Sequence, residues 1–330
     1  MDIRQVDTAS AADAAAWYDV YIAADKHDLP CGPWWLEREL RVAHQSTEYR
    51  QHVLWLAEDA GVAIGASVAR FSLKDNPRLA DVEVFVRPDA RRRGVGTALF
   101  RTLERHAAEH RRTSLLAAVS WPLRDESAPG TAFAERLGFT RRNTEIRRVQ
   151  RAPFQLARLA ELEQEALPRA AGYRLESWRD RIPQRFLLEY ARLAGRMSTD
   201  APLGDLDYEP ELWDAERVLV SEERRIKMGR DWWCTVAVAP DGSLAGMTEI
   251  VVPGESDQHG YQGDTIVDPD HRGHRLGLLL KVANLRTVLT DRPGISSIWT
   301  WNAESNRFMI SVNEKLGYVK AGWLAMYQRD

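Results

Sequence analysis

Alternating hydrophobic and polar residues predict the same order of strands and helices twice along the chain. In the predicted helix at 96–109, for example, Leu99, Leu103 and Ala107 fall on one face. Alternating helices and strands of ordinary length indicate an α/β fold. The predicted strands are 3–6, 52–57, 63–71, 82–86 and 114–119 in the first half, and 173–178, 233–238, 244–251, 262–267 and 297–301 in the second. The predicted helices are 11–24, 34–42, 96–109 and 130–137, then 184–193, 210–227, 277–289 and 303–316.

One loop sequence occurs in both halves. Residues 86–96 read VRPDARRRGVG, and residues 267–277 read VDPDHRGHRLG. The same separation along the chain pairs Leu99 with Leu280. A separation that holds beyond the loop itself indicates an internal repeat at the scale of a domain.

The repeat predicts two related domains. We place the first at residues 1–150 and the second at residues 171–330. The segment between them, 151–170, is charged and helix-prone and lies outside either repeat, so we expect it to be a linker. A chain of 330 residues is long enough for two domains of ordinary size.

Each repeated loop follows an apolar strand and opens an amphipathic helix. This arrangement points backbone N–H groups and the positive end of a helix dipole at an anion. Glycine lets the backbone approach that anion closely, and an arginine adds a charge-assisted contact. The predicted anion-binding residues are Arg91, Arg92, Arg93, Gly94, Val95, Gly96 and Thr97, and Arg272, Gly273, His274, Arg275, Leu276 and Gly277.

A strand, then V-x-P, then R-x-x-G-x-G opening a helix resembles the acetyl-coenzyme A pyrophosphate loop of GNAT-superfamily acetyltransferases. In the second half, Arg275 stands where the middle glycine is expected, and we expect it to need a right-handed helical backbone. The run from Trp301 to Asn306, followed by the turn at 316–318, resembles the elements that flank the pantetheine arm. The resemblance implies two tandem GNAT-like domains, each a mostly antiparallel mixed sheet flanked by helices.

The resemblance also implies which residues contact the cofactor arm and the oxyanion. Asn302 and Asn306 would bond the pantetheine arm, although Asn306 is equally suited to cap a helix. The backbone N–H of Val86 or Val267 would stabilise the oxyanion. The first half keeps only the Leu-Gly-Phe turn at 137–139, which predicts weaker arm binding there.

Carboxylates on the strand that enters each loop are the candidate catalytic bases. The repeat aligns Glu83 with Asp264, and the family often uses a carboxylate on this strand to accept the amine proton. Glu249, on the neighbouring strand, and His259 are further candidates. Each is also compatible with being an ordinary charged strand-edge or loop residue.

The usual acid of the family is absent from both halves. Where a tyrosine is expected four residues before the turn glycine, the chain has Ala134 and Asn313. A thiol has a pKa near 8.5 and is able to leave as a thiolate. The departure therefore affects acid catalysis and not acyl transfer as such.

Charge and composition exclude several classes of partner. A formal net charge of -3 gives no electrostatic footprint for nucleic acid or an anionic membrane. No apolar run approaches the roughly 20 residues of a membrane span, and the N-terminus lacks a signal-peptide pattern, so we expect a cytoplasmic protein. His271 and His274 have metal-like spacing but no evident third ligand, so we expect no metal.

Together these features predict an N-acetyltransferase that uses acetyl-CoA as co-substrate and a small-molecule amine as acceptor. We expect the C-terminal domain to be catalytic because its motifs cover both ends of the cofactor, and the chain to be a monomer or homodimer. The acidic segment 197–214 either contacts a cationic amine or is a solvated surface loop. A non-catalytic acyl-CoA-binding protein and a transferase of longer acyl groups are the alternatives.

Overall fold

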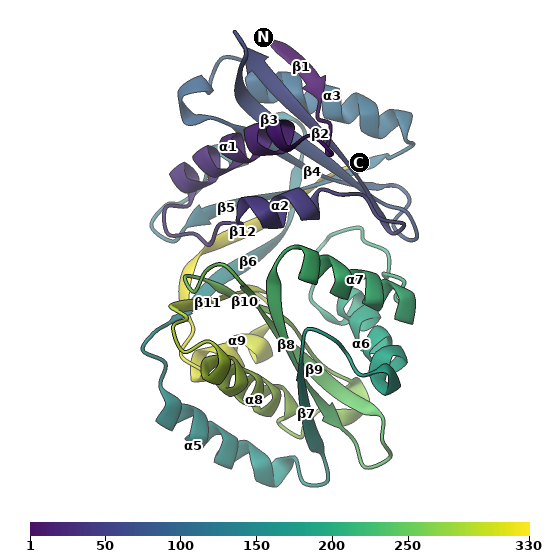
Figure 1. The fold of residues 1–330 in the computed structure, drawn as a ribbon, viewed down its shortest axis with the longest axis vertical. Coiled ribbons are helices and arrows are strands. Elements are labelled where there is room, and N and C mark those ends of the chain that lie inside the picture. Colours follow the sequence, from purple (N-terminus) through teal and green to yellow (C-terminus); the bar gives the residue numbers. More distant parts are fainter. The chain divides into compact units, whose positions relative to one another are not determined.

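The structure is a computed structural model that describes all 330 residues, and it divides into two compact units (Figure 1). The N-terminal unit comprises Met1–Glu145, Leu203–Glu209 and Gly322–Asp330. The C-terminal unit comprises Ile146–Pro202 and Pro210–Ala321. Each unit is described on its own below.

The N-terminal unit has a sheet with the strand order β1-β2-β3-β4-β5-β12. Neighbouring strands are antiparallel except β4 and β5, which are parallel only at 79–81 and 114–116. Because β4 continues to Val86 without this pairing, the two strands part beyond Asp81. The elements are β1 (Asp2–Gln5), α1 (Ala11–Asp28), α2 (Glu37–Ala43), β2 (Arg50–Asp59), β3 (Val62–Ser72), β4 (Leu79–Val86), α3 (Val95–Glu109), β5 (Ser114–Pro122), α4 (Pro129–Arg136) and β12 (Val319–Arg329).

Alternation along β3 gives this sheet a core on each face. Ala66 and Val68 lie in the core that α1 and α2 cover, whereas Ala69 and Phe71 lie in the core that α3 and α4 cover. A strand turns successive side chains to opposite faces, so one apolar strand serves both cores. Ser10 starts α1 because its side chain accepts a hydrogen bond from the backbone N–H of Asp13.

The C-terminal unit repeats this plan with the strand order β6-β11-β10-β9-β8-β7. Here β10 and β11 form the parallel pair, which joins only residues 260–261 to 298–299. The elements are β6 (Thr140–Arg151), α5 (Leu156–Ala166), β7 (Arg174–Arg179), α6 (Leu187–Asp200), α7 (Ala215–Lys227), β8 (Arg230–Val238), β9 (Leu244–Pro253), β10 (Gly260–Val267), α8 (Leu276–Asp291), β11 (Ser297–Ala303) and α9 (Arg307–Lys315).

Alternation along β8 again divides the core between two faces. Trp232 and Cys234 pack towards α6 and α7, and Trp233 and Ala237 pack towards α5 and α8. These side chains are at most 1% exposed. Burying a large apolar side chain contributes about 1.5–3 kcal/mol, so the alternation fixes which face of the sheet each helix covers.

The compact units differ from the predicted domains at the C-terminus of the chain and at the boundary between the two domains. The last residues of the chain pair with β5, so Gly322–Asp330 belongs to the N-terminal unit and not to a domain at 171–330. The end of β6, from Ile146, belongs to the C-terminal unit, although the predicted first domain runs to residue 150. The predicted linker at 151–170 contains α5, which buries Leu159 and Leu162 against α8.

Two predicted helices begin later than expected because polar residues cap them. The helix predicted at 210–227 starts at Ala215, where Asp214 accepts a hydrogen bond from the N–H of Arg217. The helix predicted at 303–316 is α9, which Asn306 caps through the N–H of Met309. A side-chain oxygen at the N-cap satisfies a donor that has no partner within the helix.

The contribution of β12 to the N-terminal unit is testable at Tyr327. This side chain is fully buried in the core that α3 and α4 cover, and its hydroxyl has no hydrogen-bond partner. Tyr327→Ala should lower the free energy of unfolding by about 3–5 kcal/mol, because it leaves a cavity. Tyr327→Phe should cost little or stabilise slightly, because it removes an unpaired hydroxyl. Urea unfolding measures the stability of both variants. A Tyr327→Ala variant as stable as the wild type would contradict the contribution of β12 to the core of the N-terminal unit.

Candidate functional site

The two repeated loops have the same backbone shape. Arg92 and Gly94 in the first loop, and Gly273 and Arg275 in the second, all have positive φ angles. Each loop therefore places one glycine and one arginine at its two left-handed positions, in opposite order. The prediction of a right-handed backbone at Arg275 was wrong: its φ is 56°. The left-handed conformation costs an arginine roughly 1–2 kcal/mol, and its side chain pairs with Glu165.

Both loops lead into helices whose first N–H groups are available. No side chain caps α3 or α8, and the first internal bonds run from Ala98 N–H to the carbonyl of Gly94 and from Leu279 N–H to that of Arg275. The backbone N–H groups of residues 95–97 and 276–278, which precede these bonds, have no protein acceptor. Uncapped N–H groups beside left-handed residues are suited to bind an anion. Binding of a pyrophosphate at these loops stays a prediction.

The loop arginines fasten each loop to a helix of its own unit. The guanidinium of Arg91 makes two bonds to the carboxylate of Asp28, at 2.8 and 2.9 Å. That of Arg272 donates to Asp200 at 2.9 Å. Asp28 ends α1 and Asp200 ends α6, and each arginine also donates to the carbonyl of the last residue of the preceding strand. These arginines hold the loop backbone in place, and a phosphate contact from them stays a prediction.

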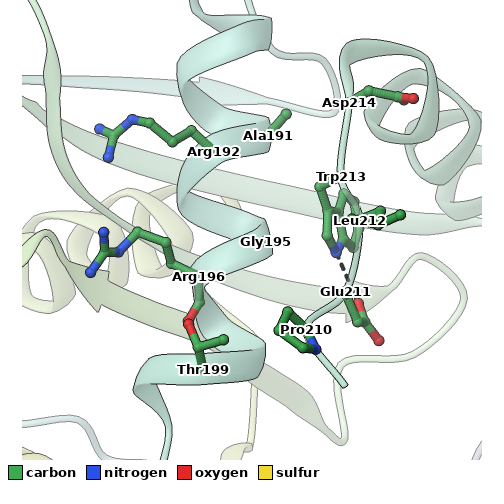
Figure 2. A pocket seen from close by; sticks show the side chains of 10 residues that line it. All are labelled: Ala191, Arg192, Gly195, Arg196, Thr199, Pro210, Glu211, Leu212, Trp213 and Asp214. Atoms are coloured by element: carbon green, nitrogen blue, oxygen red, sulfur yellow. Dashed lines mark hydrogen bonds between the residues drawn. The ribbon is translucent and has the colours of Figure 1, made fainter. Parts of the chain in front are cut away.

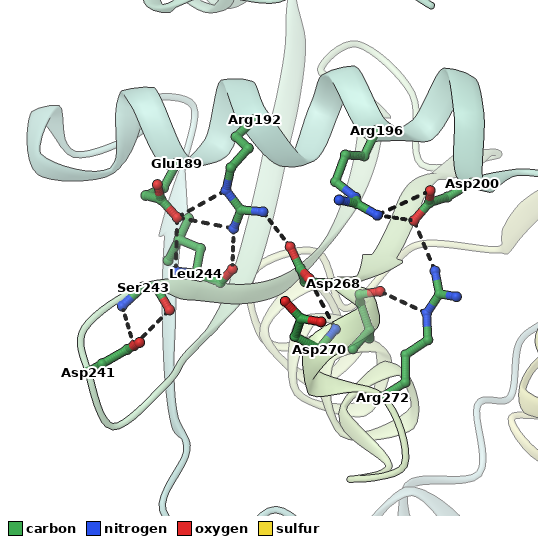
Figure 3. A network of polar contacts seen from close by, with 11 residues as sticks. Glu189, Arg192, Arg196, Asp200, Asp241, Ser243, Leu244, Asp268, Asp270 and Arg272 are labelled. Atoms are coloured by element: carbon green, nitrogen blue, oxygen red, sulfur yellow. Dashed lines mark hydrogen bonds and ion pairs between the residues drawn. The ribbon is translucent and has the colours of Figure 1, made fainter.

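Further ion pairs join α6 to the entrance of the second loop (Figure 3). Arg192 pairs with Asp268 and Glu189 and also donates to the carbonyl of Leu244. Arg196 pairs with Asp200, the same carboxylate that holds Arg272. The position of α6 is therefore tied to the shape of the loop.

Asp264 lies in an irregular stretch of β10. The pairing of β10 with β9 shifts between Gln262 and Thr265, so Gly263 and Asp264 bulge out of the ladder. The side chain of Asp264 is accessible, but neighbouring protein partly desolvates it. This desolvation and then the charges of Glu249 and Glu211 raise the pKa of Asp264 to about 7, while Arg225 acts in the opposite direction. The result is a carboxylate able to exchange a proton near neutral pH.

Glu249 has a different environment from Asp264. Its Oε2 atom accepts hydrogen bonds from Trp232 Nε1 at 2.7 Å and from Tyr190 Oη at 3.1 Å. Its Oε1 atom accepts the backbone N–H of Asp264 at 3.4 Å. These donors hold the carboxylate in one orientation, so it is less free to meet a substrate than Asp264.

Glu83, the counterpart of Asp264 in the N-terminal unit, is part of an ion-pair cluster. Arg70 donates to Glu83 at 2.6 Å and to Asp81 at 3.2 Å. The guanidinium occupies this carboxylate and leaves it less free to contact a substrate than a carboxylate without a partner. The repeat therefore places an ion-paired carboxylate in one unit and an accessible carboxylate without an ion pair in the other.

The predicted pantetheine contacts have partners within the protein. Asn302 Oδ1 accepts a hydrogen bond from Asn313 Nδ2 at 2.6 Å, and Asn306 Oδ1 accepts the N–H of Met309 at 3.1 Å. Asn306 is thus a helix cap, one of its two predicted roles. Asn313 is fully buried, and its own Oδ1 has no partner. Contacts from Asn302 and Asn306 to the cofactor stay a prediction.

A cavity of about 520 Å³ lies between α6 and the segment 210–214 (Figure 2). Gly195 lies on the helix side of the cavity, opposite Trp213. Glu211, whose charge acts on Asp264, also lines it. The lining residues are Ala191, Arg192, Gly195, Arg196, Thr199, Pro210, Glu211, Leu212, Trp213 and Asp214.

In the acidic segment 197–214, four of the six carboxylates make structural contacts, among them Asp207, which pairs with Arg78. Asp200 pairs with Arg272, Asp214 caps α7, and Glu211 accepts from Trp213 Nε1 at 2.8 Å. Glu211 also pairs with a buried arginine of α7. Few carboxylates of this segment are therefore free to contact a cationic amine.

No cluster of three or more histidine, cysteine or acidic side chains is arranged to hold a metal ion. The loop histidines contact the protein instead: His271 Nδ1 hydrogen-bonds Tyr173 Oη, and His274 Nδ1 bonds the carbonyl of Arg169. His259 hydrogen-bonds Ser297 Oγ, and burial lowers its pKa. No helix combines the length and apolar character needed to cross a bilayer.

Three residues of this site were not predicted from the sequence. Tyr190 and Trp232 hold Glu249, and Gly263 leaves space for it. Tyr190 and Trp232 are ordinary core aromatics in the sequence, and no local pattern distinguishes them. The glycine within the predicted strand 262–267 was an available signal, because glycine in a strand often marks a bulge or a close approach.

Comparison with known proteins identifies the family. The model of the Acetyltransferase (GNAT) family matches residues 16–139 and 205–318, and the chain belongs to this family. The predicted tandem GNAT architecture is thereby confirmed. Members of the family are acyltransferases, and proteins of this fold bind acyl-CoA. Comparison with curated proteins finds no match.

Solved structures resemble the whole chain. A tandem GNAT protein from the clavulanic acid biosynthesis pathway, solved without AcCoA, is 27% identical with a TM-score of 0.79, covering 99% of this chain and 98% of that one. A GCN5-related N-acetyltransferase from Sphaerobacter thermophilus is 16% identical with a TM-score of 0.66, covering 99% and 95%. N-myristoyltransferase of Saccharomyces cerevisiae with bound myristoyl-CoA is 10% identical with a TM-score of 0.60, covering 99% and 77%. The last two show the fold alone.

The raised pKa of Asp264 predicts a specific pH dependence of stability. Between the ordinary aspartate pKa near 3.9 and a folded value of about 7, the folded chain binds more protons at this site than the unfolded chain. This group should therefore lower stability as pH rises from about 4 to 7. Asp264→Asn removes the titrating group. Guanidinium unfolding should therefore show that the variant gains stability relative to the wild type when the pH is raised from 5 to 8. An equal difference at both pH values would contradict the shift.

Proposed function

We propose that the protein transfers an acetyl group from acetyl-CoA to the amine of a small molecule, with the chemistry in the C-terminal unit. The observation that carries this proposal is the difference between the two aligned carboxylates. Asp264 is accessible and has no ion pair, whereas Glu83 is paired with Arg70. Only the C-terminal unit combines such a carboxylate with the anion-binding loop.

The loop from Arg272 to Gly277 would hold the donor by its pyrophosphate, using the N–H groups at the start of α8. Bound there, acetyl-CoA supplies a thioester, an acyl group activated for attack by an amine. The gap beyond the short pairing of β10 and β11 gives the arm a place between strands, with Asn302 beside it on β11. The N–H of Val267 is the proposed oxyanion donor.

Asp264 would accept the proton of the amine. An alkyl ammonium has a pKa near 10, so little free amine exists at neutral pH without a base. A carboxylate with a pKa of about 7 is better matched to this proton than an ordinary aspartate, and its charged form still predominates at slightly alkaline pH. The cavity beside α6 would admit the acceptor, since Glu211 both lines it and acts electrostatically on Asp264.

The thiol product needs no acid from the protein. Asn313 occupies the position of the family's tyrosine and is fully buried. An amide cannot supply a proton at neutral pH, and a thiol with a pKa near 8.5 leaves readily as a thiolate. Asn313 would hold Asn302 in position through their 2.6 Å bond.

Replacing each aligned carboxylate tests the assignment of chemistry to one unit. Asp264→Asn should slow turnover of acetyl-CoA with an amine panel by about 10²–10⁴-fold, because a positioned base is lost. The affinity for acetyl-CoA should change little. Glu83→Gln is the matched variant in the other unit and should do little to turnover. Thiol release measures the rate, and calorimetry measures the affinity.

Opposite results would reassign the function. If Glu83→Gln abolishes turnover and Asp264→Asn is silent, the N-terminal unit is the enzyme. If acetyl-CoA binds but no amine releases thiol, the chain is an acyl-CoA-binding protein. If only longer acyl-CoA donors react, the proposed acetyl donor is contradicted, but the proposed site in the C-terminal unit is retained.

Donor binding by the loops is testable by a glutamate at the glycine of each first helical turn. Gly277→Glu and Gly96→Glu each place a negative side chain where a pyrophosphate would meet the helix. A Cβ at Gly96 would lie 3.4 Å from both Phe133 and Val86, whereas at Gly277 the nearest atoms are 3.8 Å away. Calorimetry with acetyl-CoA should therefore show weaker binding in Gly277→Glu without a folding defect. No heat and no thermal shift with the wild-type protein would exclude donor binding.

A further inference from the structure

The carboxylate of Glu249 rests directly on the bulge of β10. A Cβ at residue 263 would lie 2.7 Å from Glu249 Oε1 and 2.8 Å from its Cγ, closer than real side chains approach. Only glycine at this position lets Glu249 reach the backbone N–H of Asp264. Gln262 completes the bulge, because its Nε2 donates to the carbonyl of Glu249 at 2.7 Å.

Donors from two other elements hold the same carboxylate. Tyr190 on α6 is 4% exposed and Trp232 on β8 is fully buried, and both donate to Glu249 Oε2. Burial and the nearby Glu249 charge raise the pKa of Tyr190 well above its usual value, so this phenol stays a donor. Hydrogen bonds to a carboxylate stabilise its charge and fix its direction.

The charges that face Asp264 come from three elements. Glu249 on β9 and Glu211 before α7 repel a negative charge at Asp264, and Arg225 on α7 attracts it. Arg225 lies over the Trp232 ring, 4.1 Å from its centroid. Cys234, also near Glu249, has a pKa raised by burial and carries no charge at neutral pH.

We propose that Glu249 is a positioning residue, seated by Gly263, Tyr190 and Trp232, whose fixed charge makes Asp264 an effective proton acceptor. This inference rests on the proposed role of Asp264. A charge on one of two adjacent carboxylates opposes ionisation of the other. Glu249 accepts three hydrogen bonds from the protein, whereas the Asp264 side chain has neither a hydrogen bond nor an ion pair.

Titration of Asp264 by carboxyl-carbon NMR in the full-length protein tests the inference without any need for turnover. In the wild type the midpoint should lie near pH 7. In Glu249→Gln, which keeps the shape and removes the charge, it should fall by about one unit or more. Gly263→Ala should lower it by a smaller amount, because the added methyl displaces the Glu249 carboxylate. Asp241→Asn, in the turn between β8 and β9, is the control and should not move it.

The pH profile of turnover separates this inference from the proposed function. In Glu249→Gln, the acidic limb of kcat/KM should move to lower pH by the same amount as the NMR midpoint, with less change in KM. An unmoved midpoint in both Glu249→Gln and Gly263→Ala would overturn the inference, even if Asp264 is the base. If the midpoint moves while Asp264→Asn keeps full activity, the electrostatic coupling stands and the assignment of the base falls. If Glu249→Gln or Gly263→Ala does not fold, the remaining variant decides, because the first removes the Glu249 charge and the second displaces it.

Discussion

The short parallel contact between β10 and β11 is the constraint on which the C-terminal site depends. The strands pair only at residues 260–261, so β10 runs on to Val267 without β11 beside it. The bulge at Gly263 lies along this unpaired stretch, and the loop that follows the strand leads into α8 after Arg275. An accessible carboxylate, an open strand edge and a loop with uncapped N–H groups thus follow one another within about fifteen residues of chain.

The two units place different side chains on one backbone plan. Both have the strand parting, the left-handed loop, and an arginine bonded to the last residue of a helix. They differ in the side chains on the strand before the loop. In one unit Arg70 pairs with Glu83, and in the other no cation pairs with Asp264. Family membership covers both units, so the distinction between them comes from these neighbours and not from the fold.

The sequence predicts the local features of this protein well and the tertiary contacts poorly. The repeated loop, its helices and the strand carrying Asp264 are visible because they are contiguous in the chain. The left-handed Arg275 was missed because the loop's conformation, held by contacts to Asp200 and Glu165, overrides the preference of arginine. Placement of the last strand in the N-terminal unit depends on pairing between distant segments, which no local pattern reveals.

The most direct test of the account is a crystal structure of the protein with bound coenzyme A. The account predicts the pyrophosphate on the N–H groups of residues 273–277, with the arm entering the gap between β10 and β11. The sulfur should then lie beside the bulge that carries Asp264. Coenzyme A held only at residues 91–97, with its sulfur remote from Asp264, would contradict the claim that the C-terminal unit performs acyl transfer.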